Sequence, residues 1–172
     1  MQTNISIRSI READLAEFKA LRLEALRTSP EAFGTDFEED SRHPDSTWIE
    51  RVRKAVHDPD GSIVCADAGT ELAGMVGVYR NQGAKCRHAA GIWGVFVRPQ
   101  YRGQKLGKRM IESALQWCRS REIRIVRLTV AVHNAPAIKC YETCGFSVSG
   151  TSPEEIRVGD KYFDELLMWR RP

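Results

Sequence analysis

The chain has 172 residues, of which 42% are hydrophobic and 28% are charged, and its net charge is only +3. These values fit one soluble globular domain with a sizeable core, and they exclude a disordered chain or a protein that coats nucleic acid. No apolar run is long enough for a membrane span and the first residues lack the apolar core of a signal peptide, so we predict a cytoplasmic protein.

The first sixty residues predict one strand and two helices. Ile5 and Ile7 alternate with polar residues, as in a strand. Asp14 stands where it can cap a helix, whose apolar face we expect to contain Leu15, Phe18, Leu21 and Ala25. Thr47 and Glu50 have the spacing of a capping box, which predicts a second helix start. Apolar residues follow at helical spacing until HDPDG, residues 57–61, ends that helix.

The middle of the chain predicts three strands. Residues 62–67 and 72–80 are strand-like runs, and the sequence AGTE between them has the glycine and the length of a hairpin loop. A third run, residues 88–97, is richer in apolar residues. Because Gly91 and Gly94 lie inside this run, we expect a bulge or the close approach of another group to its backbone.

Helical spacing of apolar residues between 110 and 118 predicts a further helix, and residues 123–132 predict a strand. Residues 88–132 therefore form a strand, helix, strand unit. A short helix over residues 135–144, closed by Gly145, precedes strand-like runs at 146–149 and 162–169. We predict an α/β (α+β) fold in a single domain over residues 1–172, with a mixed sheet flanked by helices.

The stretch RPQYRGQKLGKRM, residues 98–110, has five basic residues, two glycines and no acid. A glycine-bearing loop before a helix directs free backbone N–H groups and the positive helix end at one point, which suits a phosphate. Arg102, Lys105, Lys108 and Arg109 can add charge-assisted contacts. The pattern is neither a Walker loop nor a GxGxxG turn, so a small pyrophosphate fits better than a polymer. A solvated turn without a ligand is the alternative.

Asn134 and Tyr141 are a second candidate pair. They are seven residues, about two helical turns, apart, so both side chains can face one cleft. The alternative is purely structural, with Asn134 as a helix cap and Tyr141 as a core aromatic residue.

These segments together resemble the GNAT family of N-acetyltransferases. The resemblance runs in order from GIWGVFVRP through YRGQKLGKRM to LTVAVHNAPAIKCYETCGF, and it extends to DKYFDELLM near the end. LRLEALRTSPEAFG is a looser match to the family's first helix. The resemblance implies a strongly twisted mixed sheet that splays open to admit acetyl-CoA.

The resemblance also implies which residues form the site. Val95, Phe96 and Val97 match the strand end whose backbone pairs with the pantetheine arm. The phosphate loop of the family falls on Arg102, Gly103, Gln104, Lys105, Leu106 and Gly107, and Lys108 follows it. Lys105 occupies a position that is usually glycine. Asn134 matches a cofactor-contacting asparagine, and Tyr141 matches the candidate general acid.

The implied reaction is transfer of an acetyl group from acetyl-CoA to a primary amine by direct attack, without an acyl-enzyme intermediate. A bulge near Gly94 and Val95 could direct a backbone N–H at the thioester oxygen, and Tyr141 could protonate the sulfur. Many relatives have a glutamate in the preceding strand, where this chain has Ile92 and Trp93. Glu38, Glu39 and Asp164 are weaker candidates for a base, and we assign none.

The acceptor site is expected to lie around residues 33–48, with a contribution from the last strands near Tyr162. Four acids there, Asp36, Glu38, Glu39 and Asp40, could attract a cationic amine or could be solvated surface. The acceptor stays open among polyamines, aminoglycosides, amino acids and protein amines.

The five cysteines are odd in number and irregularly spaced, which predicts reduced thiols. Cys140 and Cys144, with His133 nearby, have too few ligands at recognised spacings for zinc, so we predict no metal.

Two other classes of function remain open. One is a non-catalytic acyl-CoA-binding sensor or partner-binding domain, suggested by Lys105 and the missing glutamate. The other is a nucleic-acid binder that uses residues 98–109 and nearby arginines, against which the small net charge argues. We expect no nucleic-acid or membrane partner, and a homodimer remains open.

Overall fold

The structure is a computed structural model that describes residues 5–172, and it confirms the predicted mixed α/β architecture. Residues 1–4, which belong to the predicted domain and to the segment inspected for a signal peptide, lie outside the described residues. Seven strands form one sheet in the order β1-β2-β3-β4-β5-β7-β6. They are β1 (Ser6–Ser9), β2 (Gly61–Asp67), β3 (Leu72–Arg80), β4 (Ala89–Val97), β5 (Ile125–Ala131), β6 (Ser147–Val158) and β7 (Lys161–Arg170).

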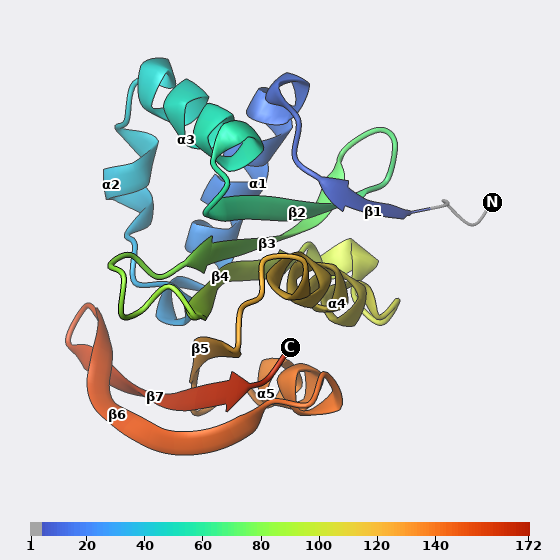
Figure 1. Cartoon of the computed structure of the whole chain (residues 1–172). Coiled ribbons are helices and arrows are strands. Elements are labelled where there is room, and N and C mark those ends of the chain that lie inside the picture. Colours follow the sequence, from blue (N-terminus) through green and yellow to red (C-terminus); the bar gives the residue numbers. More distant parts are fainter. Residues whose placement is uncertain (1–4) are drawn as a thin grey trace.

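Helices cover both faces of the first four strands (Figure 1). They are α1 (Leu15–Thr28), α2 (Phe37–Ser41), α3 (Asp45–His57), α4 (Leu106–Arg119) and α5 (Ala135–Thr143), with short 3-10 helices η1 (Glu12–Asp14), η2 (Pro30–Ala32) and η3 (Pro99–Tyr101). In Figure 1, α1 and α3 lie on one face and α4 lies on the other. All strand pairs are antiparallel except β4 and β5, which the crossover helix α4 joins in parallel.

Two hydrophobic clusters lie on opposite faces of the sheet because successive side chains of a strand point to opposite sides. On β2, Ile63 and Cys65 pack with α1 and α3, whereas Val64 and Ala66 pack with α4. The predicted apolar faces of α1 and α4 are confirmed in their main positions. Phe18, Leu21 and Ala25 are buried, as are Met110, Ile111, Ala114, Leu115 and Cys118.

Of the two helix caps predicted in the first third of the chain, Asp14 is at the N-cap position of α1 but does not cap through its side chain, and the capping box at Thr47 and Glu50 is wrong. The Asp14 carboxylate makes no capping hydrogen bond to α1, because it accepts hydrogen bonds from the Arg11 backbone and the Arg8 side chain instead. Helix α3 begins at Asp45 after Pro44, so Thr47 and Glu50 lie inside the helix. Pro44 sets the start of this helix because its fixed backbone angle suits a helix entrance.

The prediction about the glycines of the third strand is confirmed. Between the register pairs Gly77–Trp93 and Met75–Phe96, β3 has one residue and β4 has two, so Gly94 and Val95 form a bulge. Gly94 has φ +63°, a left-handed angle that glycine adopts without strain. At Gly91, an added Cβ atom would lie 2.4 Å from the Tyr79 ring, so this glycine permits a close approach.

Strands β4 and β5 diverge soon after they meet. They pair only from Ala89 to Gly91 on β4 and from Ile125 to Arg127 on β5. Beyond these pairs the two strands have no mutual register, and the antiparallel hairpin of β6 and β7 continues the sheet from β5 (Figure 1). This divergence gives the sheet the splayed form that the resemblance implied.

Within residues 5–172, no helix combines the length and apolar character needed to cross a membrane. The five cysteines are free thiols. The cytoplasmic location stays a prediction.

Candidate active site

A cleft of about 930 Å³ opens where β4 and β5 separate. Its walls are the ends of these two strands, from Ile92 to Val97 and from Leu128 to Ala131. The loop before α4 and the first turns of α5 close its two ends, and the segment around η2 contributes a further wall. The cleft therefore lies at the sheet's opening, between segments that are far apart in the sequence.

Most of the predicted site residues meet in this cleft. The residues that line it include Val95, Phe96, Val97, Arg102, Gly103, Lys105, Leu106, Gly107, Lys108, Asn134 and Tyr141. Gln104 is not among the lining residues. The structure thus brings eleven of the twelve predicted catalytic and cofactor-binding residues to one cavity. Their roles stay predictions.

The loop before α4 presents backbone N–H groups to the cleft. Lys105 precedes the helix with φ +58°, and Gly103 has φ +80°. The first intrahelical bond goes from the Arg109 N–H to the Lys105 carbonyl, which leaves the amides of the first turn free for a ligand. Lys105 thus adopts the left-handed conformation that suits the glycine usually found at this position, and its side chain remains at the rim.

The basic residues of this stretch have different tasks. The Arg102 guanidinium donates to the Val97 carbonyl over 3.1 Å and stacks on Phe96. Lys108 lies 3.6 Å from Glu112. The prediction for Arg109 is wrong, because it donates to the Ile5 carbonyl over 3.0 Å and lines a different surface hollow. Arg98 is buried and pairs with Glu24 and Glu71, so it anchors the strand end instead of offering charge to a ligand.

Asn134 and Tyr141 both line the cleft, from opposite ends of α5. The Asn134 side-chain oxygen accepts a hydrogen bond from the Ala137 N–H over 3.3 Å, so the residue also acts as the helix cap. Tyr141 is 5% exposed and packs edge-to-face on Phe146. Burial raises the pKa of the Tyr141 phenol above its usual range, so the hydroxyl keeps its proton at neutral pH.

Cys140, which the sequence analysis considered only as a metal ligand, also lines the cleft. Its sulfur lies 3.4 Å from the position of a Cβ atom on Gly107, so this glycine lets α4 and α5 approach closely. A hydrogen bond from the Cys144 thiol lowers the pKa of Cys140 to about 7 against the opposing effect of burial, and Lys108 contributes in the same direction. Within residues 5–172, His, Cys, Asp and Glu side chains form no group of three that could hold a metal ion.

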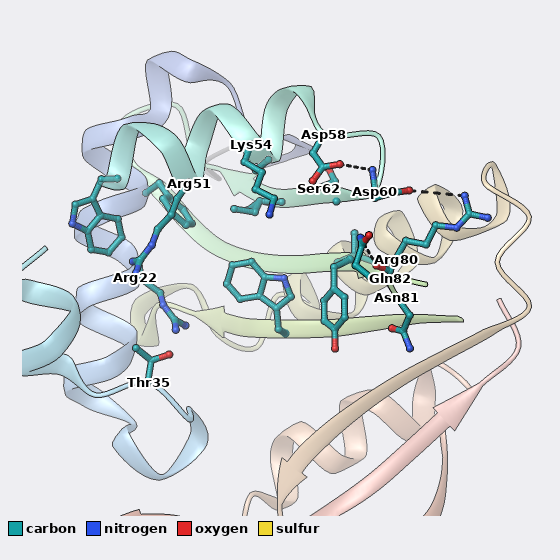
Figure 2. A pocket seen from close by; sticks show the side chains of 18 of the residues that line it. Arg22, Thr35, Arg51, Lys54, Asp58, Asp60, Ser62, Arg80, Asn81 and Gln82 are labelled. Atoms are coloured by element: carbon teal, nitrogen blue, oxygen red, sulfur yellow. Dashed lines mark hydrogen bonds and ion pairs between the residues drawn. The ribbon is translucent and has the colours of Figure 1, made fainter. Parts of the chain in front are cut away.

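A second pocket, of about 810 Å³, has charged side chains such as Arg22, Arg51 and Lys54 among its lining residues (Figure 2). Its walls come from α1, α3, β2, β3 and the segment 80–86. Trp93, the residue before the β4 bulge, lines both the pocket and the cleft, so the two cavities adjoin at this side chain. We name this second cavity the acceptor pocket, because Thr35, Asp40 and Trp48 line it and belong to the segment 33–48 that the sequence predicts on the acceptor side.

Two pairs of aromatic residues and glycines shape the floor of the acceptor pocket. The Trp93 indole occupies the space over Gly77, where an added Cβ atom would lie 2.0 Å from the ring. The Tyr79 ring covers Gly91 in the same way. Both pairs are register partners on β3 and β4, so each ring lies across its neighbouring strand.

The acids predicted to attract an amine have other roles. Asp36 caps α2 by accepting hydrogen bonds from the backbone of Glu38 and Glu39, and Glu38 pairs with Arg42. Asp40 is buried and lines the acceptor pocket together with Thr35 and Trp48. Tyr162 and the base candidates Glu38, Glu39 and Asp164 are absent from the lining of both cavities.

Sequence reasoning missed one wall of the cleft. Ser29, Glu31, Ala32 and Phe33 line it, although the sequence suggested that residues from Phe33 onward belong to the acceptor side. Pro30 was the available signal, because proline at the first position of a 3-10 turn holds this segment in a fixed bend.

The cleft fits acetyl-CoA in its donor groups and shape. The free amides at the start of α4 and the charges of Lys105 and Lys108 suit a pyrophosphate. The β4 edge beyond Gly91 lacks a strand partner on the β5 side, so its backbone groups can pair with the amides of a pantetheine arm. The bulge at Gly94 and Val95 lies outside the register of β3, and both residues line the cleft.

Comparisons with known proteins agree with this geometry. A model of the acetyltransferase (GNAT) family matches residues 19–146. The L-amino acid N-acetyltransferase AaaT of Escherichia coli is 28% identical over 169 residues, which cover 94% of this chain and 96% of that protein.

Two solved structures have the same fold. An acetyltransferase of the GNAT family from Streptococcus pneumoniae superposes with a TM-score of 0.86 at 23% identity, over 98% of this chain and 99% of that one. A spermidine N-acetyltransferase from Vibrio cholerae, in complex with CoA and spermine, has a TM-score of 0.79 at 20% identity, over 99% of this chain and 96% of that one.

Proposed function

The chain belongs to the acetyltransferase (GNAT) family, and from this premise we propose that it transfers the acetyl group of acetyl-CoA directly to a primary amine. The observation that carries the proposal is the junction of two cavities at the β4 bulge, with the predicted cofactor residues on one side and an aromatic pocket on the other. Direct transfer needs both partners at one point, and this junction offers such a point.

Acetyl-CoA, when bound, supplies an activated acetyl thioester. The protein's own contribution begins with the loop before α4, whose free amides and lysines bind and orient a pyrophosphate. The unpaired edge of β4 then fixes an extended chain along the strand. A backbone N–H at Gly94 or Val95 can stabilise negative charge on a carbonyl oxygen, since the bulge removes these residues from the β-ladder.

Tyr141 is the proposed general acid. Two observations support this role: the raised pKa keeps the phenol protonated, and Tyr141 is one of the residues that line the cleft. We assign no side chain as the base, since the carboxylates considered from the sequence line neither cavity, and water in the acceptor pocket can remove the proton from the amine.

The test is calorimetric titration of the full chain with acetyl-CoA, with desulfo-CoA and ATP as comparisons, followed by an assay of CoA release with a panel of amines. We expect micromolar binding that depends on the pantetheine arm, and CoA release with at least one amine. Absence of acetyl-CoA binding would refute the assignment of the cleft. Tight binding without release by any amine would instead favour the acyl-CoA sensor, the alternative suggested by Lys105.

A further inference from the structure

Arg22 is the most unusual charged residue of the acceptor pocket. It projects from the middle of α1, lines the pocket, and is only 8% exposed. Its Nη1 atom is buried and has no hydrogen-bond partner among residues 5–172. Desolvation is the main cause that lowers the pKa of this guanidinium. A buried cationic donor without a partner is costly, so a ligand that supplies an acceptor atom would be stabilising.

The charges around Arg22 are not balanced. Asp40 is 1% exposed and is shared between Arg51, at 2.9 Å, and Arg22, at 3.6 Å. His43 also lies 3.7 Å from the same carboxylate. One acid therefore faces two permanently charged guanidinium groups. Figure 2 shows Arg22 and Arg51 at one end of the pocket, with Lys54 over its middle and Arg80 at the far end.

The acids at the far end do not restore the balance. Asp60 accepts two hydrogen bonds from Arg87, at 2.8 and 2.9 Å, and lies 4.0 Å from Arg80. Asp58 accepts a hydrogen bond from the Asp60 backbone. No ion pair of Lys54 is found in the part of the chain that the structure describes. The end of the pocket beside Arg22 thus has an excess of positive charge.

Arg22 also lies next to the junction of the two cavities. Its guanidinium carbon is 5.8 Å from the Trp93 ring centre, and its Nη1 atom is 3.7 Å from the position of a Cβ atom on Gly94. An anion bound to Arg22 would therefore lie close to the bulge where the amine must be acetylated. An amine whose anionic group is one or two carbons away fits this short spacing.

From these observations we infer that the acceptor pocket binds the carboxylate of an α-amino acid at Arg22 and Arg51, so that its α-amino group is the one acetylated. The inference rests on the proposed function for the transfer step. The amino acid side chain would extend over the exposed faces of Trp93 and Tyr79, which are 38% and 48% exposed. Polyamines would add positive charge to a pocket that already has an excess, so they are excluded by repulsion.

The test compares matched acceptors that differ only in the carboxylate. CoA release is measured with a panel of L-amino acids, with the amides of the same amino acids, with the corresponding decarboxylated amines and with spermidine. We expect kcat/KM for the best amino acid to exceed that of its amide and its amine by about 10- to 100-fold, the range of charge-assisted hydrogen bonds. Equal rates for acids, amides and amines would overturn the inference and leave the proposed acetyltransferase function intact.

Variants locate the effect at Arg22. Arg22→Gln should lower kcat/KM for the amino acid by about 10- to 100-fold and leave that of the decarboxylated amine nearly unchanged, while Arg22→Lys should recover part of the loss. Arg51→Gln provides a second, more exposed position if Arg22→Gln fails to fold. Arg53→Gln is the matched control for Arg51→Gln, since Arg53 also lies on α3. It pairs with Glu12 and lines neither cavity. An equal loss for acid and amine in the Arg22 and Arg51 variants would contradict a carboxylate contact.

Direct binding separates this inference from the proposed function. Calorimetry of N-acetyl amino acids and N-acetyl amines, each titrated into the protein with CoA present, needs no turnover. Binding of the acids that weakens in Arg22→Lys or Arg51→Gln supports the carboxylate site even if no amine is acetylated. Failure of every N-acetyl amino acid to bind would overturn it.

Discussion

Tyr141 combines a buried phenol with a position on the cleft wall, which is what a proton donor needs. Tyr141→Phe removes only the hydroxyl, so we predict a loss in kcat of about 100-fold with the acetyl-CoA Kd unchanged. Stopped assays at saturating substrate and calorimetry measure the two quantities. Tyr101→Phe is the control, because the Tyr101 hydroxyl lies on the same cleft but donates to Glu71. Unchanged kcat in Tyr141→Phe would remove the acid role.

Lys105 is a lysine in a left-handed backbone conformation, and this conformation disfavours any side chain. Lys105→Gly should raise the free energy of unfolding by about 0.5–1 kcal/mol, measured by denaturant titration. It should also weaken acetyl-CoA binding several-fold if the ammonium group contacts phosphate. Glu122 has φ +57° outside both cavities, so Glu122→Gly should gain stability without a change in affinity. A stable Lys105→Gly variant with unchanged affinity would show that the backbone alone binds the phosphate.

Cys140 should be the most reactive thiol of the cleft. Because its pKa is lowered to about 7, its thiolate fraction rises through neutral pH, and alkylation by iodoacetamide should accelerate over the same range. Acetyl-CoA should slow the reaction, since Cys140 lines the cleft. Peptide mass spectrometry resolves the sites, with Cys118 as the internal reference, because burial raises the pKa of that thiol to about 12. Equal labelling with and without acetyl-CoA would contradict the position of the ligand.

Several site residues could be predicted from the sequence because local chemistry determines their place. Gly94 and Asn134 are examples, since a glycine inside a strand marks a bulge and an asparagine before Ala-Pro-Ala marks a helix start. Arg22 and Arg109 were not predictable in this way. The residues around each arginine have the sequence of an ordinary exposed helix surface. Only the packing of distant segments buries Arg22 and brings Arg109 to the Ile5 carbonyl.

At the scale of elements, Arg8 on β1 forms ion pairs with residues of η1 and β2. Its guanidinium lies 2.6 Å from Asp14 and 2.7 Å from Asp67. These contacts lower the pKa of both carboxyl groups; the largest effect on Asp14 is the hydrogen bond from Arg8, and the largest on Asp67 is the Gly69 backbone N–H. The same guanidinium thus joins β1, η1 and β2.

This arrangement makes stability fall in acid. A carboxylate with a lowered pKa in the folded state stabilises the fold above its unfolded pKa, and the effect is lost as pH falls through about 4 toward the folded value. Arg8→Gln should reduce the free energy of unfolding by about 1–2 kcal/mol at pH 7 and by much less at pH 3. Urea titrations at both pH values test this. Arg11→Gln, at an exposed neighbouring position, should show a clearly smaller difference, because the Arg11 side chain lowers the pKa of Asp14 only through its charge.

The predicted boundaries of helices and strands agree with the structure where the spacing of apolar residues is strongly periodic. Strands β2 and β3 lie within one residue of their predicted ends, since alternation and a hairpin loop define both. The five-residue helix α2 was missed because it is too short to show a helical period. Strand β6 extends nine residues beyond its predicted end at Ser149, because Pro153 and the irregular register near Ser152 interrupt the alternation without ending the strand.

Across the whole molecule, the sheet consists of two parts that share only three residue pairs between β4 and β5. A ligand in the cleft would contact both parts, so acetyl-CoA should stabilise the folded chain. At about 100 times its Kd the gain is about 2.7 kcal/mol, which corresponds to a rise in Tm of about 5–10 °C for a chain of this size. ATP, which lacks the pantetheine arm, should give a clearly smaller rise at equal concentration. Equal shifts would mean that the ligand does not bridge the strands.

The divergence of β4 and β5 is a property of the whole chain that the residues alone did not predict. The parallel pairing depends on α4, and the separation beyond Gly91 depends on how the β6 and β7 hairpin continues the sheet from β5. Only the resemblance to a family supplied that expectation, since no local pattern encodes the gap between two strands.

The aromatic rings that lie over Gly77 and Gly91 have a consequence for how the enzyme can change its preferences. Neither glycine is among the residues that line the acceptor pocket, yet each fixes the orientation of a ring that does. A single methyl group added at Gly77 would displace the Trp93 ring, and one added at Gly91 would displace the Tyr79 ring. Either change would alter the shape of the acceptor pocket. Selection for new substrates can therefore act on two buried backbone positions that no acceptor ever touches, and a mutant library restricted to contact residues would never sample them.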